Sequence, residues 1–314
     1  MSLIDLVARA RNKQNFSDIE GYLEFASQLV SGKANYIQAE IVCQNETDYR
    51  FWQLPIDARF AISRPINSTL FCTANEISQF QTDMLGDIHR RDFMTALNQA
   101  DRALINKVIY TCQQSIGVVL DALPANESNF ARKLNGDLFE RQIQLWIKRM
   151  GVECSSATVR VPVLVAGVKQ CDMNFQHDLV VRSADAVKII GSVKTSSKDR
   201  IGKIFVDKML LKALTGEAVP QIAIFLNDVQ RGKKSDQSYK VSSTFLPGHF
   251  KAYTIKVNPL DGVYYCDLRP NMKTDPLLSR TISQIDNFFC EEIWSFLDRQ
   301  TEAPIEIADD QGLS

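Results

Sequence analysis

The fold of this chain is decided by residues 178–200, which read DLVVRSADAVKIIGSVKTSSKDR. Residues 178–182 and 187–194 are rich in Val and Ile, and a short polar segment separates them. Two branched apolar runs joined by a tight turn are typical of neighbouring antiparallel strands. The segment therefore predicts a β-hairpin within a sheet.

The register of this hairpin predicts which side chains share a face. If the chain turns near Ala184 and Asp185, Asp178 lies opposite Ser192, and Lys194 lies one same-face step further along. A carboxylate and an ammonium group then project from adjacent strands on one side of the sheet. Such a pair suits a metal-dependent phosphodiesterase, because the carboxylate can hold Mg²⁺ and the lysine can orient or deprotonate the attacking water. A surface ion pair on a hairpin is the alternative explanation.

The segments around the hairpin predict an α/β fold with a mixed central β-sheet flanked by helices. Two further segments have strand character and two have the apolar spacing of helices: residues 158–165, 221–226, 135–150 and 200–214. A late hairpin is expected from residues 253–257 and 263–268. The order of helices and strands indicates that residues 126–300 form one core around a single sheet.

The rest of the chain divides by composition. Residues 1–125 predict a mainly helical N-terminal region, with a short strand or two between its helices. The segment LPANESN at 123–129 is the best candidate for a linker before the core at 126–300. Residues 301–314 are acidic and are expected to be a disordered tail.

The composition is that of an ordinary globular protein. The chain has 314 residues, of which 45% are hydrophobic and 23% charged, with a formal net charge of -1. No segment approaches the about 20 consecutive apolar residues of a membrane span, and the N-terminus lacks the pattern of a signal peptide, so a cytoplasmic protein is expected. Seven scattered cysteines without a C-x-x-C pair give no sign of a zinc or redox site. Any polyanion must be met by a local basic patch.

Such a patch follows the hairpin. Between Lys194 and Lys212 the chain has six basic and two acidic residues, a local excess of four positive charges. Asp207 lies seven residues after Arg200, which returns it to nearly the same face of the predicted helix. This stretch is a plausible phosphate-facing surface, although a solvated helix face would have a similar composition.

Residues 135–226 resemble the PD-(D/E)xK nuclease core. The helix LFERQIQLWIKRMG carries Glu140, the strand HDLVV opens at Asp178, and GSVKTSSKDR carries Lys194. The acid that usually stands two residues before the lysine is replaced by Ser192. One branch of type II restriction endonucleases has this Ser-x-Lys pattern and carries the acid on the next helix, about 13 residues past the lysine. Asp207 lies 13 residues after Lys194.

The same branch has a basic-acidic-Arg triplet four to six residues after the lysine, which reads C·G pairs of CCGG or CC-N-GG sites. Lys198, Asp199 and Arg200 occupy these positions. Arg200 can donate two hydrogen bonds to guanine O6 and N7, and Asp199 can accept one from cytosine N4. Lys198 can support a neighbouring guanine. A solvated loop of charged residues is the alternative.

The resemblance implies a type II restriction endonuclease that hydrolyses double-stranded DNA at a short palindrome containing CC and GG. It does not cover residues 1–125, which we expect to carry dimerisation or flanking DNA contacts. Mg²⁺ is expected to be held by Asp178 and Asp207, and Glu140 would assist a second metal or position Lys194. A palindrome repeats its contacts about a two-fold axis, so the working unit is expected to be at least a homodimer. Two alternatives stay open: a structure-specific repair or junction-resolving nuclease with the same core, and a non-catalytic DNA-binding module in which Ser192 marks a decayed site.

Several other residues compete for a role. Asp172 lies six residues before Asp178 and could replace it as the strand ligand, whereas His177 is expected to be a packing residue. Phe51 and Trp52 could stack on an unpaired base, but core positions are the simpler interpretation. A second basic loop could touch phosphates: it contains Arg231, Lys233, Lys234 and Lys240.

Overall fold

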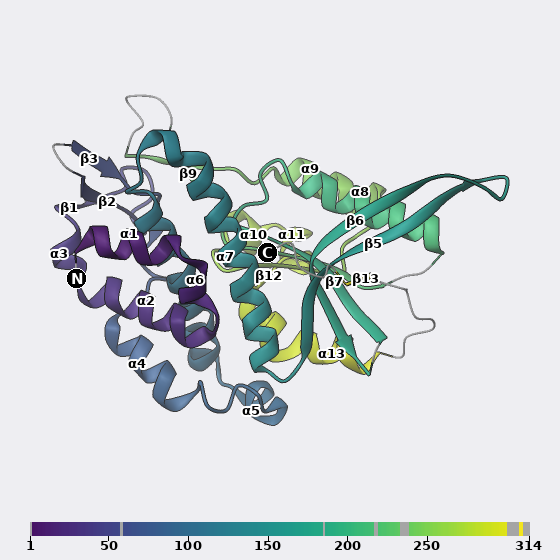
Figure 1. The fold of residues 1–314 in the computed structure, drawn as a ribbon, viewed down its shortest axis with the longest axis horizontal. Helices are drawn as coiled ribbons and strands as arrows, with labels where there is room; N and C mark the ends of the chain where they lie inside the picture. Colours follow the sequence, from purple (N-terminus) through teal and green to yellow (C-terminus); the bar gives the residue numbers. More distant parts are fainter. Residues whose placement is uncertain are drawn as a thin grey trace.

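A seven-stranded mixed sheet forms the centre of the molecule (Figure 1). The computed structural model describes residues 2–56, 59–184, 186–216, 219–232, 239–299 and 308–309. The strands lie in the order β12 (Ser283–Gln284), β11 (Gly262–Tyr265), β8 (Gln221–Phe225), β7 (Ala186–Lys194), β6 (Val168–Ser183), β5 (Glu153–Val165) and β13 (Ala308–Asp309). The sheet confirms the predicted fold class.

The register of the central hairpin agrees with the prediction. β6 pairs antiparallel with β7, and Leu179 lies opposite Gly191, which extrapolates to Asp178 opposite Ser192. β7 then pairs parallel with β8, and α8 (Ile201–Thr215) makes the crossover between them. A parallel neighbour requires such a crossover, which explains why the sheet is mixed.

Helices cover both faces of the sheet (Figure 1). One face packs with α6 (Gln99–Leu120), α7 (Ser128–Arg149), α12 (Ile285–Asn287) and α13 (Ile293–Asp298) in a single apolar cluster. The other face packs with α8, α9 (Pro247–Lys256), α10 (Pro270–Thr274) and α11 (Leu278–Thr281). The strands therefore have buried side chains on both sides, as their continuous apolar runs require.

The N-terminal region is mostly helical but contains a small sheet. Its helices are α1 (Leu3–Arg11), α2 (Ile19–Ser31), α3 (Lys33–Tyr36), α4 (Ala74–Asp83), α5 (Arg91–Ala96) and α6. Its strands are β1 (Ala39–Val42), β2 (Tyr49–Ile56), β3 (Arg59–Ile62) and β4 (Ile66–Asn67). The apolar cluster of α6 and α7 is continuous with these helices, so the expected linker at 123–129 is a turn between two packed helices.

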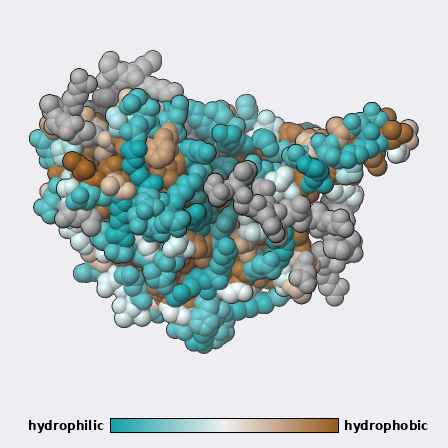
Figure 2. All heavy atoms as spheres, in the orientation of Figure 1, coloured by the Kyte–Doolittle hydropathy of each residue, from teal (hydrophilic) through white to brown (hydrophobic). Residues whose placement is uncertain are grey.

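β5 and β6 extend beyond the sheet as a long two-stranded arm (Figure 1). Ala166 and Gly167 have positive φ values of 51° and 79° and make the turn at its tip. Val165 and Val168 flank this turn and are 61% and 62% exposed, and Figure 2 shows apolar surface at the end of the arm. The arm lengthens the strand that carries Asp178, so the strand predicted from 178 begins ten residues earlier.

Two expectations about the C-terminal part differ from the structure. Residues 253–257 were predicted as a strand, but 253–256 end helix α9, where Phe250 anchors the helix in the core. β11 therefore has no hairpin partner before it and pairs parallel with β8. The predicted disorder of 301–314 falls outside the described residues except for β13, which pairs with β5. Among the described helices, none combines the length and apolarity that crossing a membrane would require.

Candidate functional site

Three predicted side chains meet at one ammonium group. The Lys194 Nζ lies 2.6 Å from Asp178 Oδ2 and 2.7 Å from Glu140 Oε1. The lysine ends strand β7, Asp178 stands on the neighbouring strand β6, and Glu140 projects from helix α7. The helix and the hairpin predicted separately from the sequence thus contribute to one site, which we call the lysine–carboxylate cluster (Glu140, Asp178 and Lys194).

A β-bulge sets the position of Asp178. Ser155 of β5 pairs with Val180, but Ala157 pairs with His177, so β6 has one residue more than β5 over this interval. Bulges of this kind re-aim side chains next to functional sites. Two hydrogen bonds then fix the aspartate. The Val193 amide donates to its Oδ2 at 2.9 Å, and the Gln144 side chain donates to its main-chain oxygen at 2.7 Å.

The electrostatics of the cluster follow from its partial burial. Burial raises the pKa of Glu140, the Asp178 charge raises it further, and Lys194 opposes both. Burial also lowers the pKa of Lys194, but the charges of Asp178 and Glu140 outweigh it and hold that pKa above its usual value. Lys194 is therefore an ammonium ion at neutral pH. The exposed fractions of the Lys194, Glu140 and Asp178 side chains are 31%, 28% and 10%, so a ligand can still reach the cluster.

Asp207 was predicted to hold Mg²⁺ together with Asp178, but in the structure it forms an ion pair with Lys203. It lies on the same stripe of α8 as the buried Ile204 and Leu211, so it faces the sheet, and its side chain is 17% exposed. Its carboxylate pairs with Lys203 of the same helix rather than with Lys194. The structure thus brings Asp178, Lys194 and Glu140 into contact, whereas Asp207 lies on the same side of the sheet with a separate ion pair.

The charges of Asp207 and Asp178 both act on the imidazole of His177. Burial lowers its pKa to about 4, against the opposing charges of Asp207 and Asp178. The imidazole is 2% exposed, and its Nε2 has no hydrogen-bond partner among the described residues. His177 is neutral at physiological pH and buried, which agrees with a packing residue.

The charged triplet lies directly after the cluster in the chain. Lys198, Asp199 and Arg200 are exposed in the loop between β7 and α8. The Lys198 ammonium lies 3.4 Å from the Gln230 side-chain oxygen, and Asp199 has a left-handed backbone with φ 57°. The loop therefore presents all three predicted readout side chains to solvent next to the end of strand β7, where Lys194 lies.

Asp172 lies away from the cluster. It stands on the projecting arm opposite Pro162 and pairs with Lys169 at 2.8 Å. Six residues of extended strand separate it from Asp178, which corresponds to about 20 Å. The geometry favours Asp178 over Asp172 as the strand carboxylate of the site.

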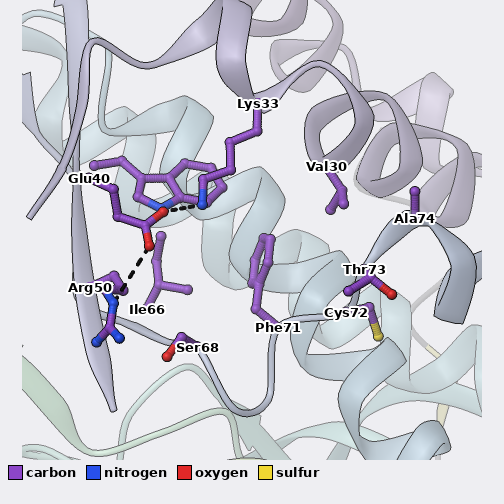
Figure 3. A pocket seen from close by; sticks show the side chains of 11 residues that line it. Val30, Lys33, Glu40, Arg50, Ile66, Ser68, Phe71, Cys72, Thr73 and Ala74 are labelled. Carbon is purple, nitrogen blue, oxygen red and sulfur yellow. Dashed lines mark hydrogen bonds and ion pairs between the residues drawn. The ribbon is translucent and has the colours of Figure 1, made fainter. Parts of the chain in front are cut away.

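The N-terminal sheet has a separate cavity of about 330 Å³ (Figure 3). Trp52 is 2% exposed and lies on its wall, with the Lys33 ammonium 4.9 Å from the ring centroid. Glu40 pairs with both Lys33 and Arg50, as the dashed lines in Figure 3 mark. Phe51 is fully buried, so neither aromatic side chain is presented for stacking. The charges of this cavity are satisfied within it.

The second basic loop is only partly described. Lys233 and Lys234 lie outside the described residues. Arg231 donates a hydrogen bond to the main-chain oxygen of Ile62 at 3.2 Å, which ties strand β9 (Val229–Arg231) to the N-terminal sheet. This arginine therefore already has a structural contact.

The donor atoms of the lysine–carboxylate cluster suit a hard divalent cation. Two carboxylates approach one positive charge, so the cluster offers more negative than positive charge and a cation would relieve this excess. Within the described residues no three His, Cys, Asp or Glu side chains converge on one point. Water and substrate oxygens would have to complete the coordination, and Mg²⁺ usually keeps several waters.

Sequence reasoning missed two residues of this region. Gln144 lies one turn after Glu140 on α7 and holds the backbone of Asp178. Asp228 follows the buried strand β8 and is fully buried itself. A carboxylate within three residues of the end of a buried parallel strand was visible in the sequence as a signal for Asp228.

Comparisons with known proteins give a fold. No protein-family model matches the sequence, and no curated protein matches it either. Among solved structures, the crystal structure of the Type IIP restriction endonuclease Kpn2I is similar, with a TM-score of 0.69 and 19% identity over 96% of this chain and 99% of that chain. The complex of restriction endonuclease PspGI with substrate DNA matches with a TM-score of 0.44 and 12% identity, over 72% of this chain and 91% of that chain. This chain therefore shares, over nearly its whole length, the fold of the restriction endonuclease Kpn2I.

Proposed function

We propose that this protein is a Mg²⁺-dependent type II restriction endonuclease that hydrolyses both strands of DNA at a short palindrome containing CC and GG. The observation that carries the proposal is the contact of Lys194 with Asp178 and Glu140, directly followed in the chain by the exposed charged triplet. A cleavage site and a base-reading loop then lie next to one another at the end of strand β7. The fold shared with Kpn2I is consistent with this activity.

Each residue of the cluster has a separate role in phosphodiester hydrolysis. A water molecule attacks phosphorus in line with the leaving 3′-oxygen, which gives a 5′-phosphate and a 3′-hydroxyl. Lys194 is protonated, so it orients this water and offsets the charge that develops on the phosphate oxygens. Glu140 is a positioning residue that holds the ammonium at 2.7 Å, and Gln144 and Val193 hold Asp178.

Asp178 and Asp207 would hold the Mg²⁺ ion. When bound, the ion would supply Lewis-acid activation of water and neutralise charge on the phosphate. Asp207 faces the sheet, but it must leave the Lys203 ammonium to join Asp178. That ion pair is exposed on its lysine side, with Lys203 66% and Asp207 17% exposed, so breaking it costs about 1 kcal/mol.

Recognition would come from the exposed triplet. Arg200 donates to guanine O6 and N7, Lys198 supports a neighbouring guanine, and Asp199 accepts from cytosine N4. Each bidentate contact contributes about 1–3 kcal/mol of discrimination. Because one chain offers one cluster and one triplet, cutting both strands of a palindrome requires at least a homodimer.

The test is digestion of a fully sequenced plasmid with Mg²⁺ and with EDTA, followed by sequencing of the fragment ends. We expect Mg²⁺-dependent cuts at one sequence that contains CC and GG. Lys194→Ala should lose cleavage by at least about a hundredfold, as for removal of a transition-state charge donor, and should retain sequence-selective binding. Lys251→Ala is the matched control, because Lys251 has a similar exposed fraction (35%) and a single carboxylate partner outside the cluster.

Other outcomes would contradict the proposal in different ways. Cuts at junctions or flaps without regard to sequence would indicate a repair or junction-resolving nuclease. DNA binding by the wild-type protein with no Mg²⁺-dependent cutting of any CC/GG-containing plasmid would indicate a non-catalytic DNA-binding module. A monomer on cognate DNA would contradict the homodimer.

A further inference from the structure

A buried carboxylate lies beneath the charged triplet. Asp228 follows strand β8 and is 0% exposed. Five donors surround its two oxygens at 2.5–2.9 Å: the Ser196 hydroxyl, the Ser197 amide, the Ser197 hydroxyl, the Thr244 hydroxyl and the Tyr265 hydroxyl. A carboxylate removed from water is stabilised only when hydrogen bonds of this kind replace its hydration. These hydrogen-bond donors to Asp228 are hydroxyl groups and one main-chain amide.

Three of the five donors belong to the loop that carries the triplet. Ser196 and Ser197 come directly before Lys198, and both hydroxyls point at Asp228. The Ser197 carbonyl in turn accepts the amides of Arg200 at 3.0 Å and Ile201 at 3.1 Å. Asp228 therefore holds the residue whose carbonyl closes the turn and begins helix α8.

The turn itself needs support from its surroundings. Asp199 has a φ of 57°, in the left-handed region that is unfavourable for residues other than glycine, although Asp tolerates it better than most. A backbone of this kind persists when neighbouring contacts hold it. On its N-terminal side, Asp228 holds Ser196 and Ser197, and the Lys198 amide donates a hydrogen bond to the Ser196 hydroxyl at 3.2 Å.

The far side of the same carboxylate is tied to the body of the protein. Tyr265 lies on β11 in the core and donates to Asp228 Oδ2 at 2.7 Å, and Thr244 donates to Oδ1 at 2.9 Å. The Thr244 amide also donates to the Asp228 main-chain oxygen at 2.9 Å. Asp228 thus joins an exposed loop to the buried Tyr265 of β11 and to the half-buried Thr244 through hydrogen bonds rather than through apolar packing.

We infer that Asp228 is the positioning residue of the readout loop: its buried carboxylate holds Ser196 and Ser197 and so sets the one conformation in which Lys198, Asp199 and Arg200 can contact base edges. The inference rests on the proposed function for its effect on DNA. The ordering of the loop itself is independent of any activity. Asp228 touches neither DNA nor the lysine–carboxylate cluster and acts through Ser196 and Ser197.

A protease experiment tests the ordering without DNA. Trypsin cleaves after Lys198 and Arg200, which are exposed but held in a turn. In Asp228→Asn one acceptor oxygen becomes an amide that faces hydroxyl donors, so we expect cleavage at these two positions at least about ten times faster than in the wild-type protein, which corresponds to about 1.4 kcal/mol of lost ordering. Tyr265→Phe removes a single donor outside the loop and should give a smaller increase at the same positions.

Asp267→Asn is the matched control. Asp267 is also buried (2% exposed) and accepts hydrogen bonds from Tyr49 at 2.8 Å and Asn67 at 3.0 Å, but it has no contact with the loop. It should lower overall stability without selective cleavage after Lys198 and Arg200. Equal protection of these positions in Asp228→Asn, Tyr265→Phe and the wild-type protein would overturn the inference.

A binding experiment tests the consequence for recognition. Asp228→Asn should lower the ratio of cognate to non-cognate DNA affinity by at least about tenfold, the value of one bidentate base contact, while Asp267→Asn keeps that ratio. Non-specific affinity should be unchanged, because the phosphate-facing charges remain. If Asp228→Asn loses loop protection but keeps the wild-type ratio, the positioning role fails. If the wild-type protein has no sequence preference, the proposed function fails and the protease result still decides the ordering.

Discussion

Replacement of Lys194 by Met removes the positive charge that joins two carboxylates and keeps most of the side-chain volume. In the wild-type protein the ammonium lies 2.6 Å from Asp178 and 2.7 Å from Glu140. Lys194→Met leaves both acids facing one another in a partly buried site. We expect lower stability without divalent cations, and partial recovery when a divalent cation takes the place of the ammonium.

The size of the effect follows from the burial of the partners. Removal of one member of a fully buried ion pair costs about 3–5 kcal/mol, whereas exposed pairs contribute about 0–1 kcal/mol. Lys194 is 31% exposed and Asp178 is 10% exposed, so the site lies between these limits. We expect a loss of about 2 kcal/mol in the free energy of unfolding at pH 7.5 in EDTA.

The pH dependence gives a second signature. Burial and Asp178 raise the pKa of Glu140, and Lys194 opposes them, so Lys194→Met raises that pKa further. A carboxyl whose folded pKa exceeds its unfolded value stabilises the fold below the unfolded pKa, and this contribution is lost as pH rises through the folded pKa. The deficit of Lys194→Met should therefore shrink as the pH is lowered from 7.5 and Glu140 takes up a proton.

Urea unfolding in EDTA and in Ca²⁺ measures both effects without cleavage. Ca²⁺ at about 100 times its dissociation constant would add about 2.7 kcal/mol of stability to a protein that binds it only when folded. Lys251→Met is the control, because Lys251 bridges one carboxylate only, Asp275, and should not change the response to Ca²⁺. Unchanged stability of Lys194→Met in EDTA, or a Ca²⁺ response equal to that of Lys251→Met, would refute the reasoning.

Three further predictions concern neighbouring residues. Arg200→Ala should lower the affinity for cognate DNA by about 1–3 kcal/mol and leave non-specific binding nearly unchanged; uniform weakening on all sequences in a filter-binding assay would reassign Arg200 to a phosphate contact. Asp207→Asn should lower Mg²⁺-dependent cleavage by at least about a hundredfold, and it should cost less than about 1 kcal/mol of stability because its partner Lys203 is exposed. Cleavage by this variant at wild-type rates across a Mg²⁺ titration would exclude Asp207 as a ligand. Burial lowers the pKa of His177 to about 4, so between pH 6.5 and 4 the unfolded state binds a proton that the folded state does not, and the free energy of unfolding in EDTA should fall by up to about 3 kcal/mol. If urea unfolding of His177→Asn shows the same loss of stability over this pH range as the wild-type protein, the prediction is wrong.

Local patterns predicted much of the sheet and of the site. The period-two runs before and after residue 184 predicted the β6–β7 hairpin, and its register agrees with the observed pairing of Leu179 with Gly191. The apolar stripe of α7 predicted the helix that carries Glu140. These features depend on neighbours in the sequence, so spacing alone was sufficient to predict them.

Other features failed or were missed because they depend on contacts between distant segments. Residues 253–257 alternate like a strand, but Phe250 packs into the core and the preceding residues form helix α9. The strand predicted from 178 omitted the arm, because residues 168–172 are exposed and residues 168–177 lack a continuous apolar run. Tertiary packing overrides weak local preferences of this kind.

The sequence by itself determined that a carboxylate and a lysine share one face of adjacent strands and that a charged triplet follows them within six residues. Only the tertiary structure decided which acids reach the lysine, since Glu140 and Lys194 are 54 residues apart and Asp207 turns to Lys203. The same holds for Asp228, which lies 31 residues from Ser197. Strand register and helix periodicity are local consequences of backbone geometry, whereas hydrogen bonds between separate elements depend on how the whole core packs.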